Sequence, residues 1–180
     1  MLRAMHLQPG IPAPALELED WKGERHTLAC YRGRRVWLAF FRYASCPLCN
    51  LRVHRMIQRW DVWAESDFQL LAVFQSPPSS IAEYVGEQRP PFPLLGDPDE
   101  VYYGLYGCDA SLRAYVAPTN AAMLAKAAGA GFLPGRMEGT KTRVPADFFI
   151  DEEGILTRCF YGKTISDHVP FEDVDDWLGV

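Results

Sequence analysis

Two apolar runs of strand length, separated by one amphipathic segment, constrain the fold of this 180-residue chain more than any other feature. Residues 36–41 read Val-Trp-Leu-Ala-Phe-Phe and residues 69–74 read Gln-Leu-Leu-Ala-Val-Phe, as is typical of strands buried on both faces. Between them, apolar residues recur at the spacing of one helix face: Val53, Met56, Ile57, Trp60 and Ala64. A strand, a helix and a strand in this order predict a right-handed crossover and a parallel strand pair.

The remaining patterns predict shorter elements around that unit. A capping box at Ser80 and Glu83 predicts a short helix that ends at Gln88. The other predicted elements are a strand and turn at residues 16–23, a short strand that leaves a loop within residues 90–97, a helix from Asp99 to Tyr106 closed by Gly107, a β-hairpin at residues 144–161 and a terminal helix at residues 171–178. Together these elements predict an α/β fold with a central mixed sheet flanked by helices.

Residues 111–137 fit this pattern least well. They contain an Ala-rich helical piece at residues 121–128 and then a Gly-rich loop, and we interpret them as an insertion before the late hairpin. The chain as a whole, residues 1–180, is expected to form a single domain, because its length suits one hydrophobic core.

Charge and hydropathy restrict the partners and the compartment. The net charge is −5, so the chain lacks the basic footprint of a protein that binds nucleic acid or an anionic membrane. No apolar run reaches the roughly 18 residues of a membrane span, and residues 1–10 lack the apolar core of a secretory signal. We therefore expect a cytoplasmic protein.

The cysteines carry the strongest chemical signal. Cys46 and Cys49 form a Cys-x-x-Cys pair between the first buried strand and the first turn of the helix. Free N–H groups and the helix dipole at such a position lower the pKa of a thiol, and the thiolate is the nucleophile. A second cysteine one turn further along the helix can close a disulfide with the first. The other cysteines have no such context and are interpreted as structural: Cys30, Cys108 and Cys159. For Cys108, which follows Tyr106-Gly107, the alternative is a distant resolving thiol.

Other candidate residues are weaker. A zinc site at the Cys-x-x-Cys pair would need a second Cys or His pair at ligand spacing, which the chain lacks, and we expect neither a metal nor another cofactor. His54 is interpreted as a surface residue of the helix. Three arginines share one face of that helix and either raise the local potential or form a solvated face: Arg52, Arg55 and Arg59. Four tryptophans are interpreted as core or interface residues: Trp37, Trp60, Trp63 and Trp177.

The order of several short segments along the chain resembles that of the thioredoxin-fold superfamily. Within it, the order resembles the peroxiredoxin-like (alkyl hydroperoxide reductase/thiol-specific antioxidant) family. The matching segments are residues 9–14, 21–23 and 28–34, Phe40-Phe41 before the cysteine pair, Asp97-Pro98, Tyr106-Gly107 and residues 149–156. The resemblance implies a thioredoxin-like fold with an N-terminal β-hairpin. It leaves residues 111–142 unmatched, as a probable insertion before the late hairpin.

The resemblance allows two assignments of the attacking cysteine. The family's pattern is Pro-x-x-x-Thr-x-x-Cys; aligned on Cys49, it places Cys46 at the Thr position and Arg42 at the Pro position. Cys49 would then attack the peroxide and Cys46 would resolve. Thioredoxin-like enzymes imply the reverse, with Cys46 nearer the helix N-terminus, more exposed and attacking. Both assignments stay open at this point.

Two further residues follow from the resemblance. The family carries an arginine just before the late strand, where this chain has Pro145, and Arg143 lies two residues earlier. Pro145 resembles the cis-proline of thioredoxin-like enzymes; the alternative is a trans-proline that starts an edge strand. Arg42 is the candidate for the missing positive charge beside the thiolate, and its alternative is an exposed residue at a strand end.

The expected function is that of a thiol-dependent oxidoreductase with antioxidant activity, which cycles a redox-active Cys46–Cys49 disulfide. It would reduce hydroperoxides or exchange disulfides, and a thioredoxin-like protein or a small thiol would reset it. The alternative is a non-catalytic thioredoxin-fold binding module with inert cysteines. The aromatic content leaves a homodimer open, and the sequence does not name the physiological substrate.

Overall fold

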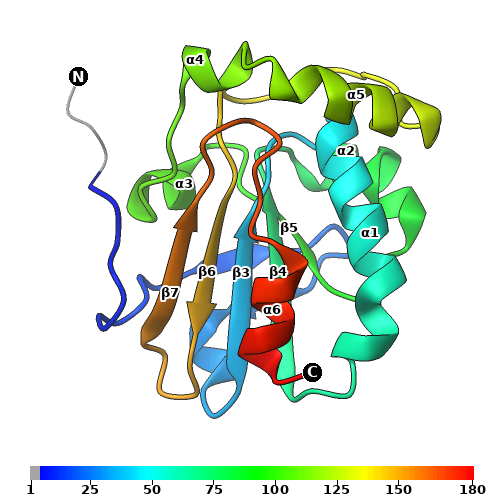
Figure 1. The fold of residues 1–180 in the computed structure, drawn as a ribbon. Helices are drawn as coiled ribbons and strands as arrows, with labels where there is room; N and C mark the ends of the chain where they lie inside the picture. Colours follow the sequence, from blue (N-terminus) through cyan, green and yellow to red (C-terminus); the bar gives the residue numbers. More distant parts are fainter. Residues whose placement is uncertain (1–4) are drawn as a thin grey trace.

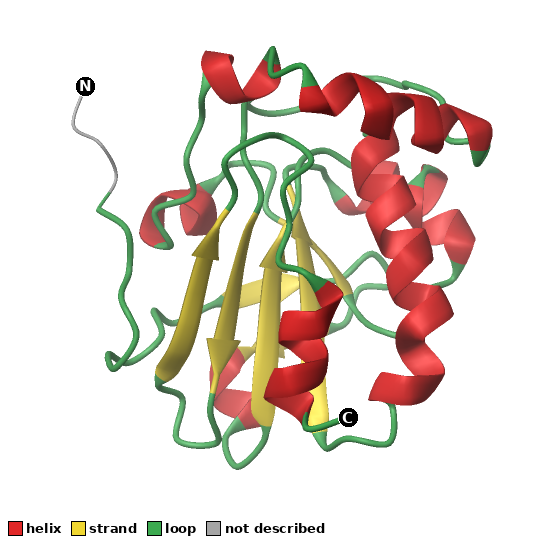
Figure 2. Cartoon of the chain, in the orientation of Figure 1, coloured by secondary structure: helices red, strands yellow, loops and turns green. Residues whose placement is uncertain are grey.

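A five-stranded mixed sheet lies at the centre of the computed structural model, which describes residues 5–180 (Figures 1 and 2). Residues 1–4 lie outside the described residues. They belong to the segment 1–10, in which no secretory signal is expected. The strand order is β5-β4-β3-β6-β7, and the first three of these strands run parallel while β6 and β7 are antiparallel to their neighbours. The strands are β3 (Arg35–Phe40), β4 (Phe68–Phe74), β5 (Leu94–Gly96), β6 (Ala146–Ile150) and β7 (Leu156–Tyr161). The predicted crossover and the late hairpin are both confirmed.

An N-terminal hairpin precedes the sheet, as the sequence resemblance implied. It pairs β1 (Glu17–Glu19) with β2 (Arg25–Thr27). The Asp20 carboxylate accepts the N–H groups of Lys22 and Glu24 and thereby closes the turn between the strands. A short 3₁₀ helix, η1 (Leu28–Tyr31), leads from the hairpin to β3.

Both faces of the sheet are buried, which explains the continuous apolar run of β3. Trp37 and Ala39 face one core, against the helices α1 (Pro47–Trp63) and α6 (Phe171–Leu178). Val36, Leu38 and Phe40 face the other core, which includes a side chain of α3 (Val101–Leu105). The two cores on opposite faces hold β3 in the middle of the molecule and fix where α1 begins.

The helix predicted to be capped by Ser80 starts earlier than expected. The structure has α2 (Pro78–Glu83), with Pro77 at the N-cap, followed by the 3₁₀ helix η2 (Val85–Gln88). Because a proline in the first turn lacks an N–H that would be unpaired there anyway, Pro78 suits this start. Ser80 is therefore not the cap, and its hydroxyl donates to the Glu138 carboxylate.

The segment at residues 111–142 contains two helices and a long return loop. Its helices are α4 (Leu112–Tyr115) and α5 (Thr119–Gly129), which Figure 1 shows across the end of the sheet where β3 and α1 meet. The return loop is tied to the body of the protein: the Ser45 hydroxyl donates to the Arg136 carbonyl and the Arg42 guanidinium donates to the Lys141 carbonyl. This segment therefore covers the start of α1. In the described part of the chain, no helix is long and apolar enough to cross a membrane.

Candidate active site

Cys46 occupies the N-cap position of α1, at the corner where the chain leaves β3. Its backbone is extended, with φ −68° and ψ 120°, and Pro47 starts the helix. The corner is held by Asn50, whose side-chain amide donates to the Ala44 carbonyl at 2.7 Å and to the Cys46 carbonyl at 3.0 Å. The Ala44 N–H in turn donates to the Ser76 hydroxyl at 2.9 Å. These contacts fix the Cys46 sulfur at the N-terminal end of the helix.

A buried cation lies against this sulfur. Arg42 is only 2% exposed, and its Nη1 donates to the Cys46 Sγ at 3.4 Å. The guanidinium carbon lies 5.0 Å from the ring centre of Tyr43 and 5.6 Å from that of Tyr115. Because the contact places the charge at the thiol, the alternative interpretation of Arg42 as an exposed strand-end residue is wrong.

The two sulfurs of the pair differ in their protonation. Burial alone would raise the pKa of Cys46, but the Cys49 thiol, the Arg42 guanidinium and backbone N–H groups of the first helical turn together lower it to about 6. Burial and the neighbouring Cys46 sulfur raise the pKa of Cys49. At neutral pH the pair therefore holds its negative charge on Cys46 and its proton on Cys49.

The expectation that Cys46 is the more exposed thiol is wrong, because both cysteines are 0% exposed. What distinguishes them is a cavity of about 340 Å³ that Cys46 lines and Cys49 does not. Both charged and apolar side chains form its wall, including Arg42, Leu48, Tyr115, Leu124 and Met137. Since the last three belong to residues 111–142, that segment builds the cover over the Cys46 sulfur.

Pro145 lies at the same end of the sheet, but it is not in the wall of this cavity. It directly precedes β6, whose first residue, Ala146, pairs with Phe40 at the end of β3. No peptide bond is cis within residues 5–180, so the cis form expected from the resemblance is wrong. The alternative is right that this bond is trans and wrong about the edge strand, because Pro145 precedes β6, an inner strand, and lies before the first residue pair of the β3–β6 ladder.

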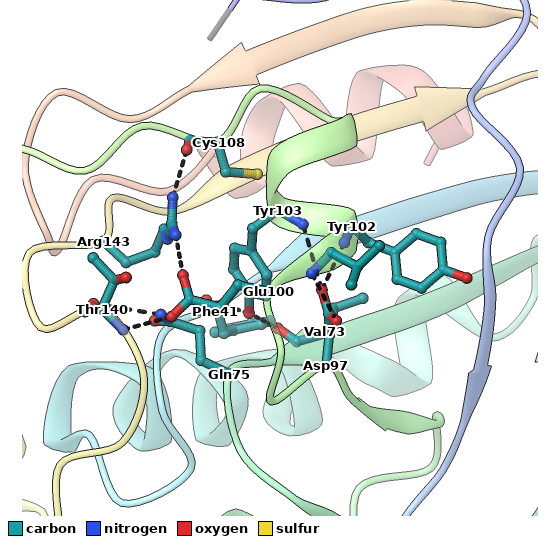
Figure 3. Close-up of polar contacts among 11 residues, drawn as sticks. Phe41, Val73, Gln75, Asp97, Glu100, Tyr102, Tyr103, Cys108, Thr140 and Arg143 are labelled. Atoms are coloured by element: carbon teal, nitrogen blue, oxygen red, sulfur yellow. Dashed lines mark hydrogen bonds and ion pairs between the residues drawn. The ribbon is translucent and has the colours of Figure 1, made fainter. Parts of the chain in front are cut away.

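The other arginine near the late strand serves a different site. Figure 3 shows Arg143 between the Glu100 carboxylate and the Cys108 carbonyl, to which its Nη1 donates at 2.6 Å. Glu100 also accepts the Thr140 N–H at 2.6 Å, so this pair anchors the return loop rather than a thiolate. In this chain the buried cation at the cysteines is thus Arg42.

Tyr103 is a supporting residue that sequence reasoning missed. Its hydroxyl lies 2.8 Å from the Phe41 carbonyl and 3.0 Å from the Val73 carbonyl, and it donates to these oxygens where β3 and β4 end (Figure 3). The sequence predicts only a short helix at residues 99–106, and a helix pattern does not indicate which groups the Tyr103 hydroxyl contacts. Tyr103 ties the two strand ends together just before the cysteine corner.

The remaining candidates lie in other surroundings. Cys108 is buried, and burial raises its pKa, while burial raises the pKa of Cys159 to about 11. Arg59 forms an ion pair with Asp175. His54 packs edge-on against the Phe132 ring, with ring centres 5.7 Å apart, which does not suit a general base. The tryptophans at positions 37 and 63 are fully buried core residues.

The fold and the cysteine corner together define a thioredoxin-fold thiol redox protein. Comparison with known proteins identifies the family: residues 9–159 match the AhpC/TSA family, and the chain belongs to it. A Mycobacterium tuberculosis protein that carries a provisional peroxiredoxin name is 33% identical over 110 residues, which are 59% of this chain and 70% of that protein. Peroxiredoxin Bcp of Escherichia coli K12 is 25% identical over 104 residues, which are 56% of this chain and 67% of that protein.

Solved structures agree on the fold. Peroxidoxin BcpB from Mycobacterium tuberculosis superposes with a TM-score of 0.68 at 18% identity, covering 97% of this chain and 96% of that one. A peroxiredoxin-like protein from Aquifex aeolicus gives a TM-score of 0.71 at 13% identity, covering 98% and 89%. The predicted thioredoxin-like fold is confirmed.

The family settles the class of activity. The protein is a thiol-dependent oxidoreductase of the kind that reduces peroxides or exchanges disulfides. This favours the enzymatic interpretation over a binding module with inert cysteines.

Proposed function

We propose that this protein reduces hydroperoxides by attack of the Cys46 thiolate, with Cys49 as the resolving thiol. The observation that carries this assignment is that Cys46 is the sulfur that lines the cavity, 3.4 Å from a buried guanidinium nitrogen. A thiolate with a pKa of about 6 is ionised at neutral pH and is ready to attack.

In the first step one bond forms and one bond breaks. The Cys46 sulfur attacks the near oxygen of the hydroperoxide, an S–O bond forms, and the O–O bond breaks. The departing oxygen leaves with the bonding pair and takes a proton to become an alcohol or water. Arg42 is placed to stabilise the thiolate before attack and the negative charge that moves to the departing oxygen. Cys46 is now a sulfenic acid.

The second step uses Cys49. Its sulfur attacks the Cys46 sulfenic sulfur, water leaves, and the Cys46–Cys49 disulfide forms. An external thiol reductant, such as a thioredoxin-like protein or a small thiol, then reduces this disulfide and becomes oxidised itself. The raised pKa of Cys49 supports this order, because a protonated thiol does not compete for the peroxide.

Disulfide exchange is the second candidate function. The observation that favours it is the Cys-x-x-Cys pair at a helix N-terminus with the first cysteine ionised, because the same thiolate can attack a substrate disulfide. A mixed disulfide at Cys46 would then be released by Cys49. We propose for both functions that the chain works as one domain in the reducing cytoplasm, where a resting dithiol persists.

One oxidation experiment tests the proposed function. Reduced protein treated with one equivalent of hydrogen peroxide is expected to lose two hydrogens, and peptide mapping by mass spectrometry places the new disulfide between Cys46 and Cys49. The other three cysteines serve as internal controls that stay reduced. Both thiols unmodified after peroxide, and again after an oxidised dithiol, would contradict both candidate functions. Oxidation by the dithiol alone would favour disulfide exchange.

A further inference from the structure

A second hollow adjoins the cysteine cavity on the far side of Leu48. Its volume is about 120 Å³, and its wall includes Arg52, Arg55, Ser166 and His168. Leu48 lines both hollows, and Ile165 in the first wall is followed by Ser166 in the second. We call this second hollow the arginine pocket. A group bound in it would therefore lie beside the space in front of the Cys46 sulfur.

The arginine pocket contains a buried polar side chain without a partner. The His168 side chain is 6% exposed, and neither of its ring nitrogens has a hydrogen-bond partner. The Nδ1 lies 3.9 Å from the Asp147 carboxylate, too far for a hydrogen bond. An unpaired polar group in a protein interior is costly, so a ring that faces a hollow in this state is suited to a ligand.

Two arginines add positive charge to the same wall. Arg52 and Arg55 lie three residues apart on one face of α1. The Arg52 Nη2 donates to the Val169 carbonyl at 2.6 Å and its guanidinium lies 3.8 Å from the Phe171 ring centre, while its Nε has no partner. These contacts hold the guanidinium in place, and they leave a donor unused.

Two nearby carboxylates, Asp147 and Glu172, offset part of the Arg52 charge, and Arg55 adds a second positive charge to the wall. Asp147 is buried, and its oxygens already accept the Trp37 indole N–H at 2.9 Å and the Val169 N–H at 3.2 Å. Burial lowers the pKa of Arg52 to about 10, so it remains protonated at neutral pH. Glu172 is the other acidic group close enough to affect Arg52. No acidic side chain lines the arginine pocket itself.

We propose that the arginine pocket binds the carboxylate of a reactant whose other end meets the Cys46 sulfur. This inference rests on the proposed function. The volume suffices, since a cavity needs only about 15 Å³ to hold a water molecule and a carboxylate is a few atoms larger. Guanidinium and imidazole N–H groups are the donors that carboxylates prefer. The carboxylate could belong to the hydroperoxide or to the small thiol that reduces the disulfide.

Two matched pairs of probes test the proposal. The first pair is a short organic hydroperoxide with a terminal carboxylate and its methyl ester, and the readout is the rate of Cys46 oxidation. The second pair is 3-mercaptopropionate and 2-mercaptoethanol, with the rate of disulfide reduction as the readout. For each pair the ratio of the charged to the neutral rate is compared between the wild type and Arg55→Gln, because this comparison cancels differences in intrinsic reactivity.

In at least one pair the ratio is expected to fall about tenfold in Arg55→Gln, as for the loss of a charged hydrogen bond. Arg55→Lys should retain part of the preference. Arg59→Gln is the matched control, because Arg59 lies one turn further along α1 and pairs with Asp175 outside the pocket. The pair that responds identifies which reactant carries the carboxylate.

Equal ratios in the wild type and Arg55→Gln for both pairs would overturn the proposal. Arg55 is half-buried, so its substitution is a mild one for the fold. Failure of the proposed function is a separate result: the neutral hydroperoxide would then leave Cys46 unoxidised whatever the ratios show.

Discussion

Replacement of Cys46 by serine should abolish peroxide turnover, with a fall in rate of about a thousandfold or more, as is usual when an enzyme loses its nucleophile. Cys49→Ser should behave differently, because the attacking sulfur and its buried arginine remain. This variant should react once with peroxide and stop as a sulfenic acid at Cys46. Peroxide consumption in rapid mixing, with dimedone trapping and mass spectrometry, measures both outcomes.

Cys30→Ser is the matched control for these variants, since Cys30 is exposed and is not part of the cavity wall. We expect its turnover to match the wild type. The assignment would be wrong if Cys46→Ser still formed a sulfenic acid at Cys49. That result would favour the family alignment, in which Cys49 attacks the peroxide and Cys46 takes the position of the family's threonine.

Replacement of Arg42 by methionine should raise the pKa of Cys46 from about 6 toward its ordinary value. The guanidinium favours the thiolate over the thiol, so without it less of Cys46 is ionised at neutral pH. The Cys49 thiol and the backbone N–H groups still lower the pKa of Cys46 in this variant, so the rise is partial. A rise to about 8 would lower the ionised fraction at pH 7 roughly tenfold, and the rate of attack with it. The second-order rate constant with hydrogen peroxide, measured from pH 5 to pH 10, tests this expectation.

The pH profile separates the two roles of Arg42. Loss caused by protonation should disappear above the new pKa, whereas loss of contact with the departing oxygen should persist at every pH. Arg42→Lys retains a positive charge and should recover part of the shift. An unchanged pKa of Cys46 in the methionine variant would show that the guanidinium does not stabilise the thiolate.

Local patterns were enough to predict the centre of the fold. The run at residues 36–41 is fully apolar because β3 is covered on both faces, and the change to helical spacing after Cys49 marks α1. Pro47 in the first turn predicts that the cysteine corner lies at a helix N-terminus, as it does. The reactive position of the Cys-x-x-Cys pair was therefore visible in the sequence.

The surroundings of the pair were not visible, because they depend on contacts between distant segments. Arg42 meets Lys141, 99 residues further along the chain, and Tyr115 and Met137 reach the cavity from the Ala-rich and Gly-rich segment. Neither helical spacing nor a motif in residues 111–142 indicates which side chains face Cys46. For the same reason the burial of Cys46 escaped prediction, and the sequence left the peptide bond before Pro145 open between cis and trans.

Family alignment and geometry lead to different nucleophiles, and the structure explains why. The alignment compares residue types along a loop, and it treats Cys46 as the counterpart of a threonine. The geometry adds two observations: the Arg42 guanidinium donates to the Cys46 sulfur, and Cys46 lines the cavity. The geometry therefore assigns the attack to Cys46.

The pKa values of the two thiols decide which cysteine is the nucleophile. Initial rates of alkylation of the reduced protein, followed from pH 4 to pH 11 with mass spectrometry of each cysteine peptide, give both values in one experiment. We expect Cys46 to be half-ionised near pH 6 and Cys49 to stay protonated well above its ordinary range. A lower pKa at Cys49 than at Cys46 would overturn this assignment and would make Cys49 the attacking thiolate.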